Sequence, residues 1–240
     1  MNLNDIYLLF IGFFSEIIGT ISGFGSSTFF VPAALFFKSL YFVMALTSIL
    51  HCFSNLSKIT LFREHFSWKF FWKLALPSVL LTGIGALASK WISVQHLIRF
   101  LGAFLVLVAV LFLLGKEHIQ RLHLSTGVAF SGLSGFLTGL FGTGGALRGL
   151  VLNALQMDKN QFVVTSAAMD LGGDLLRAVI YIYNGYMDWS QWWYIPSLAL
   201  VALSGAYIGK KILNHIDQPV FEKIVSVMVL ISGITLLIQS

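Results

Sequence analysis

Eight apolar runs follow one another along this chain and leave only short connections between them. They cover residues 3–37, 40–62, 70–91, 97–115, 122–156, 161–183, 192–213 and 221–238. A helix needs about 20 mostly apolar residues to cross the hydrocarbon core of a bilayer, so each run is long enough for one crossing. The sequence therefore predicts an all-α polytopic membrane protein that has the lipid bilayer as a partner.

The composition excludes the other broad classes of protein. Charged residues make up 10% of the chain, whereas a soluble domain carries about 25%. A disulfide scaffold is excluded because Cys52 is the single cysteine. The net charge of +5 comes without a basic cluster, so we interpret it as loop charge and expect no nucleic acid partner.

Two of the runs, 3–37 and 122–156, are too long for a single untilted crossing. Small residues interrupt both of them, as GFGSS at 23–27 and as GTGGA at 142–146. Glycine lowers helix propensity and lets the backbone turn. We therefore expect each long run to form a helix, an unwound break or re-entrant turn, and a second, shorter helix.

The two interrupted runs begin a repeat that extends along both halves of the chain. The interruptions align at an offset of 119 residues, and Asn55 and Lys58 align with Asp174 and Arg177 at the same offset. Homologous halves that are broken at the same place are typical of secondary transporters, which bind substrate where the repeats meet. Each repeat is expected to contain a broken first helix followed by three transmembrane helices. The predicted repeats, within a single membrane domain, are 1–116 and 117–240.

The distribution of basic residues predicts how the repeats are oriented. If each broken run returns to the side from which it enters, nine of the twelve Lys and Arg residues near loops share one face, and Lys38, Lys90 and Arg99 lie on the other. Cytoplasmic loops carry an excess of Lys and Arg. The basic face is therefore predicted to be cytoplasmic, with both termini outside and the two repeats inverted.

Each interruption has the form G-x-G-small-small, and a Thr-Ser pair follows in the next helix, at 47–48 and at 165–166. This double motif resembles the TauE/SafE (TSUP) family of sulfite and sulfonate exporters along essentially the whole chain. The usual family pattern has three consecutive glycines before a proline; this chain has GSS and GGA instead, and Val151 in place of the second proline. The resemblance implies secondary transport of small sulfur-containing anions without ATP, in the cytoplasmic (inner) membrane of a prokaryote.

The two interruptions carry the groups that a small oxyanion needs. An unwound break exposes backbone N–H groups, the following helix presents its positive end, and hydroxyl groups add donors. The alternative is that the glycines only let helices pack closely, as we expect for Gly205 and Gly209. The predicted substrate-binding residues at the breaks are Gly23, Gly25, Ser26, Ser27, Thr28, Gly142, Thr143, Gly144 and Gly145.

The Thr-Ser pairs in the following helices have two interpretations. Their hydroxyl groups either contact the anion or donate back to carbonyl groups of their own helices, which is the commoner outcome. Because the pairs recur at equivalent positions in both halves, we add them to the predicted substrate-binding set. These residues are Thr47, Ser48, Thr165 and Ser166.

Charged residues within apolar runs are costly, and this makes them candidates for function. Arg148 lies about one turn into the second short helix, where its planar fork suits the oxygens of a sulfonate; the alternative is that it snorkels toward a headgroup. Asp170, Asp174 and Arg177 share one helix face. Asp174 and Arg177 are therefore predicted to form an internal ion pair, or else one of the aspartates carries a coupling proton.

Three polar residues of the first half complete the set of candidates for proton coupling or ion pairing. Glu16 stands about a dozen residues into the first helix, where it serves either a proton relay or a structural hydrogen bond. His51 titrates near neutral pH when exposed, but a single histidine in a helix is more often an interior hydrogen-bonding group. Lys58 is the cation of the pair that is equivalent to Asp174 and Arg177.

No enzyme or cofactor motif accompanies these residues. The sequence has no metal-ligand constellation, no Gly-x-x-x-x-Gly-Lys-Ser/Thr and no Gly-x-Ser-x-Gly. We therefore expect no metal, no cofactor and no catalytic residue. The predicted function is secondary transport of a small sulfur-containing oxyanion by alternating access, coupled to protons or driven by the membrane potential. An anion channel, an intramembrane enzyme and a scaffolding subunit are the alternatives; direction and oligomeric state stay open.

Overall fold

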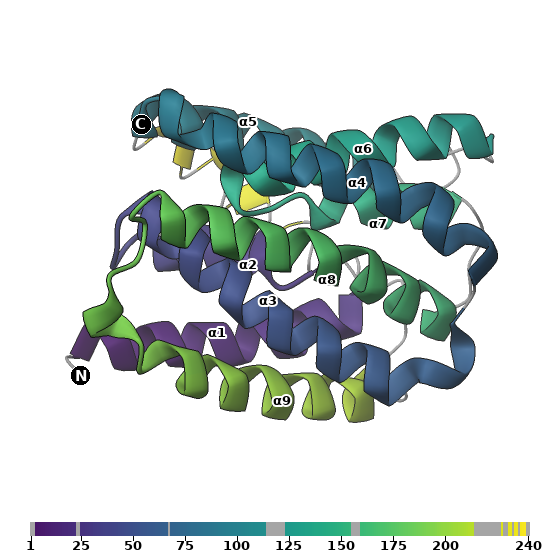
Figure 1. Ribbon diagram of the computed structural model, residues 1–240, viewed down its shortest axis with the longest axis horizontal. Coiled ribbons are helices and arrows are strands. Elements are labelled where there is room, and N and C mark those ends of the chain that lie inside the picture. The colour runs from purple at the N-terminus through teal and green to yellow at the C-terminus, as the bar shows by residue number, and fades with distance from the viewer. Residues whose placement is uncertain are drawn as a thin grey trace.

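The computed structural model describes residues 3–22, 25–66, 68–113, 123–154 and 159–213, together with residues 227, 230, 231, 233, 234 and 236–238. Over these residues the regular structure is entirely helical, without a strand. Figure 1 shows the long helices running side by side along the longest axis of the molecule. The predicted all-α class is confirmed for this part of the chain.

The lengths and compositions of the helices suit a membrane. Within the described residues, five stretches are apolar and long enough to cross a bilayer: Leu3–Ser22, Leu40–His65, Phe71–Trp91, Val94–Leu111 and Leu124–Phe141. The predicted runs 161–183 and 192–213 are also helical over the length of a span. They are less apolar because of the charges within the first and the two lysines that end the second. Most of the run 221–238 lies outside the described residues.

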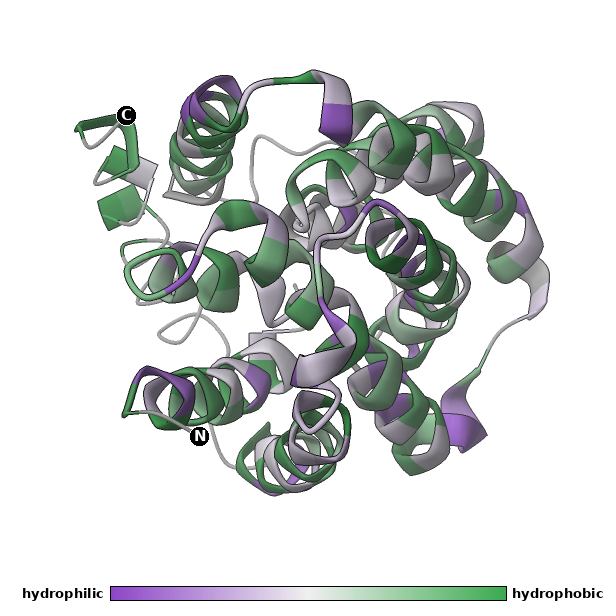
Figure 2. Ribbon diagram, turned by 60° about the vertical axis from the view of Figure 1, so that its left-hand side comes forward, coloured by the Kyte–Doolittle hydropathy of each residue, from purple (hydrophilic) through white to green (hydrophobic). Residues whose placement is uncertain are grey.

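The distribution of side chains is the reverse of that in a soluble protein. Large apolar side chains such as Phe14, Leu80 and Leu107 face outward, whereas charged side chains such as Glu16 and Arg177 are fully buried. Figure 2 shows hydrophobic residues on the outer faces of the helices as well as between them. The described part of the chain therefore places its apolar surface where lipid is expected.

The first long run is a helix, a break and a shorter helix, as predicted. α1 (Leu3–Ser22) ends before the break and α2 (Ser27–Ala34) begins after it. Gly25, between them, has a φ of 87°, a left-handed conformation that favours glycine. Nζ of Lys38, just beyond α2, lies 3.0 Å from Oδ1 of Asp5, near the start of α1. The run therefore folds back, so that both of its ends lie on the same side.

Three long helices and two short 3-10 turns follow in the first half. They are α3 (Leu40–Phe62), η1 (Arg63–His65), α4 (Trp68–Ala88), η2 (Ser89–Trp91) and α5 (Val94–Leu113).

The second long run is broken in the same way. α6 (Leu124–Phe141) is followed by the break and by α7 (Gly145–Ala154). Gly142 has a φ of 79°, and its N–H donates to the carbonyl of Thr138 at 2.9 Å, which ends α6 with a left-handed cap. Both predicted breaks are therefore present, and each contains a glycine in a left-handed conformation.

α7 also turns back along the preceding helix. Leu152, near its end, lies in an apolar cluster against which Leu124 and Val128, at the start of α6, are packed. The remaining elements of this half are α8 (Lys159–Tyr183), η4 (Trp189–Gln191) and α9 (Tyr194–Leu213).

α3 and α8 form the centre of the structure. They pack against each other, with α1 and α9 on one side and α4 and α6 on the other (Figure 1). α3 also contacts α9, and α8 also contacts α4. The polar residues of α3 and α8 are consequently enclosed by helices from both halves of the chain.

Glycines allow the outer helices to approach closely. A Cβ at Gly205 of α9 would lie 2.6 Å from the Cβ of Glu16 in α1, and one at Gly209 would lie 2.7 Å from the Cβ of Thr20. The packing interpretation of these two glycines is confirmed. A Cβ at Gly139 of α6 would lie only 2.0 Å from the carbonyl oxygen of Thr82 in α4.

We expect Gly139→Leu to destabilise the protein by forcing α4 and α6 apart. Overpacking of this kind costs about 1–3 kcal/mol of unfolding free energy, and here the added side chain would meet backbone. The measurement is the thermal unfolding midpoint of the purified protein in detergent. Ala129→Leu adds similar bulk to an exposed position of the same helix and should leave the midpoint unchanged. An equal fall in both variants would contradict the packing argument.

Candidate functional site

Two sets of polar side chains face each other across the contact between α3 and α8. Each set has the spacing i, i+4, i+7, which places its members on one helix face. The sets are His51, Asn55 and Lys58 in α3 and Asp170, Asp174 and Arg177 in α8, and all six side chains are buried. Nδ2 of Asn55 donates to Oδ2 of Asp174 at 2.6 Å, so two positions that are 119 residues apart in the sequence meet directly.

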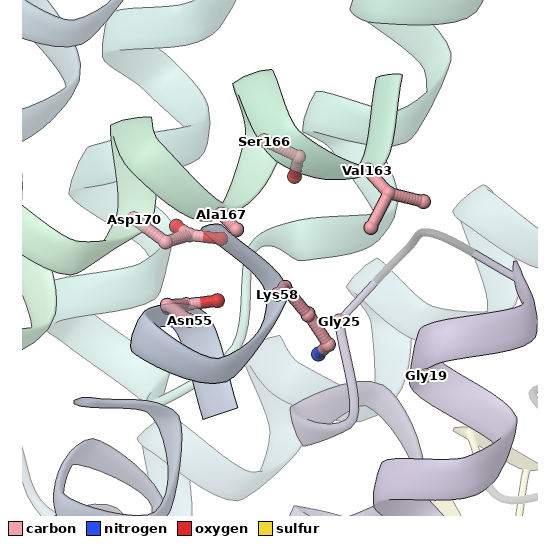
Figure 3. Close-up of a pocket in the computed structure, with 8 residues that line it drawn as sticks. All are labelled: Gly19, Gly25, Asn55, Lys58, Val163, Ser166, Ala167 and Asp170. Carbon is pink, nitrogen blue, oxygen red and sulfur yellow. The ribbon is translucent and has the colours of Figure 1, made fainter. Parts of the chain in front are cut away.

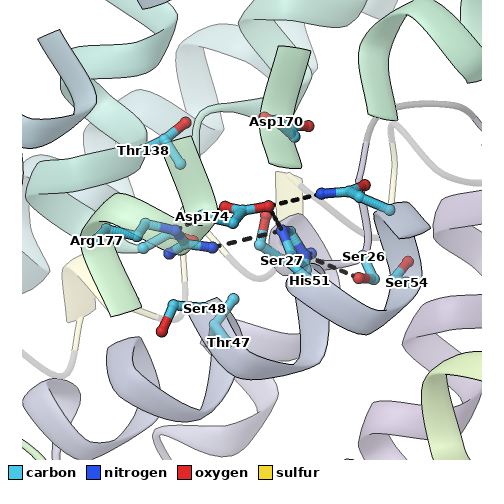
Figure 4. Close-up of polar contacts among 12 residues, drawn as sticks. Ser26, Ser27, Thr47, Ser48, His51, Ser54, Thr138, Asp170, Asp174 and Arg177 are labelled. Atoms are coloured by element: carbon cyan, nitrogen blue, oxygen red, sulfur yellow. Dashed lines mark hydrogen bonds and ion pairs between the residues drawn. The ribbon is translucent and has the colours of Figure 1, made fainter. Parts of the chain in front are cut away.

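All three positions of one set align with the three positions of the other at the same offset. His51 and Asp170 are also 119 residues apart. Because histidine and aspartate are chemically dissimilar, this pair of positions gives no signal of similarity, unlike Asn55 with Asp174 and Lys58 with Arg177. In the structure His51 lies against Asp174 and Arg177 (Figure 4), and Lys58 lines the same cavity as Asp170.

Glu16 has several polar partners, although its neighbours in the sequence are mostly apolar. Its Oε1 accepts a hydrogen bond from Ser26, and its Oε2 accepts one from Ser54. Nζ of Lys58 lies 3.3 Å from Oε2 and forms an ion pair with it. Ser26 belongs to the first break, so Glu16 ties α1 to this break and to α3. Ser54 was missed by the sequence analysis because a single serine on an apolar helix carries no signal.

The predicted ion pair between Asp174 and Arg177 is present. Nε of Arg177 donates to Oδ1 of Asp174 at 2.8 Å. Nη1 of the same guanidinium donates to the carbonyl of Gly142 at 3.3 Å. The pair therefore holds the second break against α8, a role that its sequence spacing did not indicate.

His51 connects the first break to the charged residues of α8. Its Nε2 lies 2.9 Å from Oγ of Ser26 and 3.2 Å from the backbone N of Ser27. Its Nδ1 lies 3.4 Å from Nη2 of Arg177 and 3.7 Å from Oδ2 of Asp174. The interpretation of His51 as an interior hydrogen-bonding group agrees with this geometry.

Arg148 does not snorkel toward a headgroup, because its side chain is buried and forms an ion pair with Asp170. This pair has no signal in the sequence, because it joins the second short helix to α8. Within the described part of the chain, Nε of Arg148 has no hydrogen-bond partner. The guanidinium therefore keeps one donor that is not used by Asp170.

The hydroxyl groups near the breaks fall into two groups. Thr47 donates to the carbonyl of Val43 and Ser48 to that of Ala45, both at 2.6 Å, so these two bond back to their own helix. Among the described residues, four buried hydroxyl groups lack a hydrogen-bond partner; they belong to Thr20, Thr28, Thr143 and Thr165. A buried polar group without a partner is costly and calls for a ligand or another explanation.

The two breaks lie next to each other. A Cβ placed on Gly25 would lie 3.9 Å from the Cα of Gly145 and 3.9 Å from Cε1 of His51. Gly144 is packed closely as well, because its carbonyl accepts a hydrogen bond from Ser134 at 2.8 Å. Gly23 lies outside the described residues. The predicted meeting of the two breaks is therefore found for Gly25 and Gly145.

A small cavity opens beside the first break, with room for about one water molecule. Figure 3 shows side chains of α3 and α8 pointing into it from opposite walls. Its lining residues are Gly19, Gly25, Asn55, Lys58, Val163, Ser166, Ala167 and Asp170. Four predicted site residues thus line the cavity, whereas Thr47, Ser48 and the glycines of the second break are not part of its lining.

In the described part of the chain, no three His, Cys, Asp or Glu side chains are grouped as metal ligands. A helical bundle with outward-facing apolar residues, whose two helix breaks meet above buried ion pairs, has the architecture of a membrane transporter. A sequence model of the sulfite exporter TauE/SafE family matches residues 8–236, so the chain belongs to this family. No curated protein and no solved structure matches the chain.

Membership of the family confirms the resemblance seen in the double motif. TauE/SafE proteins are membrane transporters. Together with the five apolar helices, this identifies the chain as an integral membrane protein.

We expect Arg177→Gln to destabilise the protein more than the double variant Asp174→Asn/Arg177→Gln does. The single variant leaves the carboxylate of Asp174 buried and unpaired, which costs about 3–5 kcal/mol, whereas the double variant removes both charges. Thermal unfolding of the two single variants, the double variant and the wild type gives the coupling energy. If the loss of stability in the double variant equalled the sum of the losses in the two single variants, the ion pair would not be the source of the destabilisation.

Proposed function

We propose that the protein is a secondary transporter that carries a small sulfur-containing oxyanion, such as sulfite or a sulfonate, across the membrane. The observation that carries this proposal is the adjacency of two broken helices, at Gly25 and Gly145, within a member of the sulfite exporter family. Broken helices at membrane depth are the usual binding elements of secondary transporters because they offer free backbone donors and helix termini.

The unpartnered hydroxyl groups support binding of an anion at the breaks. Thr28 and Thr143 lie at the two breaks, and Thr165 lies in α8. A small oxyanion has several acceptor oxygens and needs convergent donors, which these hydroxyls and Nε of Arg148 supply. We assign Ser27, Gly144 and Ser166 to the same binding region, and Thr47 and Ser48 to its supporting wall.

The packing of the helices supports two equivalent halves. Exchanging α1 with α6, α3 with α8, and α4 with α9 converts the contact of α1 with α9 into that of α6 with α4. It also converts the contact of α3 with α9 into that of α8 with α4. We therefore propose two repeats related by a pseudo-twofold axis through the contact between α3 and α8, with α2 and α7 as the equivalent short helices.

The return of the first broken run, shown by the ion pair of Asp5 with Lys38, supports inversion of the second repeat. Each repeat then crosses the membrane an odd number of times, so the second copy enters from the opposite side. The nine basic residues that share one face lie on the cytoplasmic side in this arrangement. Alternating access follows from rocking of one repeat against the other about the breaks.

The buried carboxylates provide groups that can couple transport to a proton gradient. Glu16, Asp170 and Asp174 are enclosed between the two repeats, where their protonation changes the charge that faces the substrate. We propose that transport is coupled to protons.

We expect Thr143→Val to reduce anion flux by about tenfold or more. A hydrogen bond to a charged group contributes about 1.5–3 kcal/mol, and valine keeps the shape of threonine but removes the donor. The measurement is uptake of sulfite and of methanesulfonate by proteoliposomes. Thr60→Val is the matched control, because Thr60 is exposed and bonds to its own helix. Undiminished flux through Thr143→Val would remove this hydroxyl from the site; absence of flux of any anion in the wild type would refute the transporter.

We expect cysteines at Ser93 and Glu64 to react from opposite sides of the membrane. Both positions are exposed and lie at opposite ends of α4. In a Cys52→Ser background, a membrane-impermeant maleimide applied to intact cells should label Ser93→Cys, and it should label Glu64→Cys only after the cells are opened. The reverse pattern would invert the proposed orientation, and labelling of both from outside would contradict the crossing of α4.

A further inference from the structure

Three cations and three carboxylates are buried near the contact between α3 and α8, and each cation already has a partner. Lys58 is paired with Glu16, Arg177 with Asp174, and Arg148 with Asp170. With His51 neutral, the formal charge of this set is zero. An anion that enters such a site adds an uncompensated negative charge in a medium of low dielectric constant, which is costly. The anion therefore needs a positive charge that enters with it.

Two of the three carboxylates have several partners, and the third has one. Glu16 accepts hydrogen bonds from Ser26 and Ser54 in addition to its contact with Lys58. Asp174 is held in a similar way, by Arg177 and by the amide of Asn55. In the described part of the chain, Asp170 has Arg148 as its one partner. Asp170 is thus the carboxylate that can be released with the fewest broken contacts.

Asp170 is also the carboxylate that a ligand can reach. Its side chain lines the cavity, and its exposed fraction is 9%, whereas Glu16 and Asp174 have none. Figure 3 shows its carboxylate pointing into the cavity, across from Lys58. A ligand in this cavity would therefore meet Asp170 before the other two acids.

The partner of Asp170 is suited to an oxyanion. Arg148 carries a planar fork of donors that matches two oxygens of a sulfonate or of sulfite. Its Nε is one of the buried donors without a partner in the described structure. An oxyanion can consequently bind Arg148 with more hydrogen bonds than Asp170 makes there.

We propose that Asp170 is an internal counter-anion that competes with the substrate for Arg148 and takes up a proton when the substrate replaces it. This inference rests on the proposed transport function. In the exchange, the carboxylate of Asp170 gains one proton from water at the open side, and the oxyanion takes its place beside the guanidinium. One negative charge is neutralised for each one that enters, so the charge of the site does not change. Release of the anion returns the proton to water on the other side.

The surroundings of Asp170 are compatible with this exchange. Lys58 faces it from α3 and Arg148 from α7, whereas Asp174 and Arg177 lie farther along α8, where His51 contacts them. Lys58 and Arg177 keep their own carboxylates, so neither replaces the proton. α4 and α6 also lie close to α8; Lys73 of α4 is exposed, and α6 has no charged residue. The charged residues of η1 lie at the start of α8, near Asn160.

The test measures proton uptake that accompanies anion binding. Sulfite and methanesulfonate are titrated by calorimetry into the purified full-length protein at a mildly acidic pH where both probes are monoanions. Repeating the titration in two buffers of different ionisation enthalpy gives the number of protons bound. The wild type should take up about one proton per anion, and its affinity for methanesulfonate should fall about tenfold per pH unit once Asp170 is ionised.

Asp170→Asn should bind methanesulfonate without proton uptake and with an affinity that no longer depends on pH. In proteoliposomes this variant should still exchange anions but should not accumulate them against a gradient when a proton gradient is applied. Asp5→Asn is the matched control: it makes the same substitution in the ion pair with Lys38, far from the cavity, and should retain the proton uptake of the wild type.

A second measurement on the wild type does not depend on the folding of any variant. If one proton moves with each monoanion, flux of methanesulfonate is electroneutral and does not respond to an imposed membrane potential. Anion binding without proton uptake, a flux that follows the potential, or retained pH dependence in Asp170→Asn would each overturn this inference and leave the transporter standing. Failure of the wild type to bind or transport either anion would overturn both.

Discussion

Charges enclosed in a membrane protein have no water to solvate them, so each must find its partner within the chain. This constraint determines the centre of the structure. Glu16, Lys58, Arg148, Asp170, Asp174 and Arg177 satisfy it as three ion pairs, and every pair touches one of the two helix breaks or a helix that follows one. The breaks can remain irregular at this depth because the charges hold them: Glu16 binds Ser26 in the first, and Arg177 binds the carbonyl of Gly142 in the second. The ion pairs and the breaks therefore depend on each other.

The remaining helices make this centre possible by enclosing it on two sides. α1 and α9 cover one flank and α4 and α6 the other, and in both flanks glycines let backbones approach more closely than any larger residue would allow. Close packing excludes lipid from this centre, where a small cavity remains beside Gly25. Apolar side chains cover the outside, where their contact with lipid has no cost. The apolar residues at the surface thus anchor the protein in lipid, and the polar and charged residues are kept in the interior.

Features that depend on neighbouring residues were predictable from the sequence. The two helix breaks follow from GFGSS and GTGGA, and the pair of Asp174 with Arg177 follows from a spacing of three residues on a helix. The pairs of Glu16 with Lys58 and of Arg148 with Asp170 join residues 42 and 22 positions apart. They exist because the broken runs fold so that Glu16 of α1 meets α3 and Arg148 of the short helix α7 meets α8. The residues around a break do not determine where the returning helix packs. The sequence therefore did not identify the partners of Glu16 and Arg148.

The difference between the two halves has a physical reason at the contact of α3 with α8. In the proposed repeat, aligned sets meet at this contact, so identical halves would bury net charge. With the histidines neutral, two His-Asn-Lys sets would carry +2 and two Asp-Asp-Arg sets would carry −2. The observed sets carry formal charges of +1 and −1 with His51 neutral, and Asn55 donates to Asp174 across the contact. Glu16 and Arg148 add one charge of each sign. The difference between the two sets therefore allows the contact to be buried without net charge, and it places an acid, Asp170, where the aligned position in α3 has a histidine.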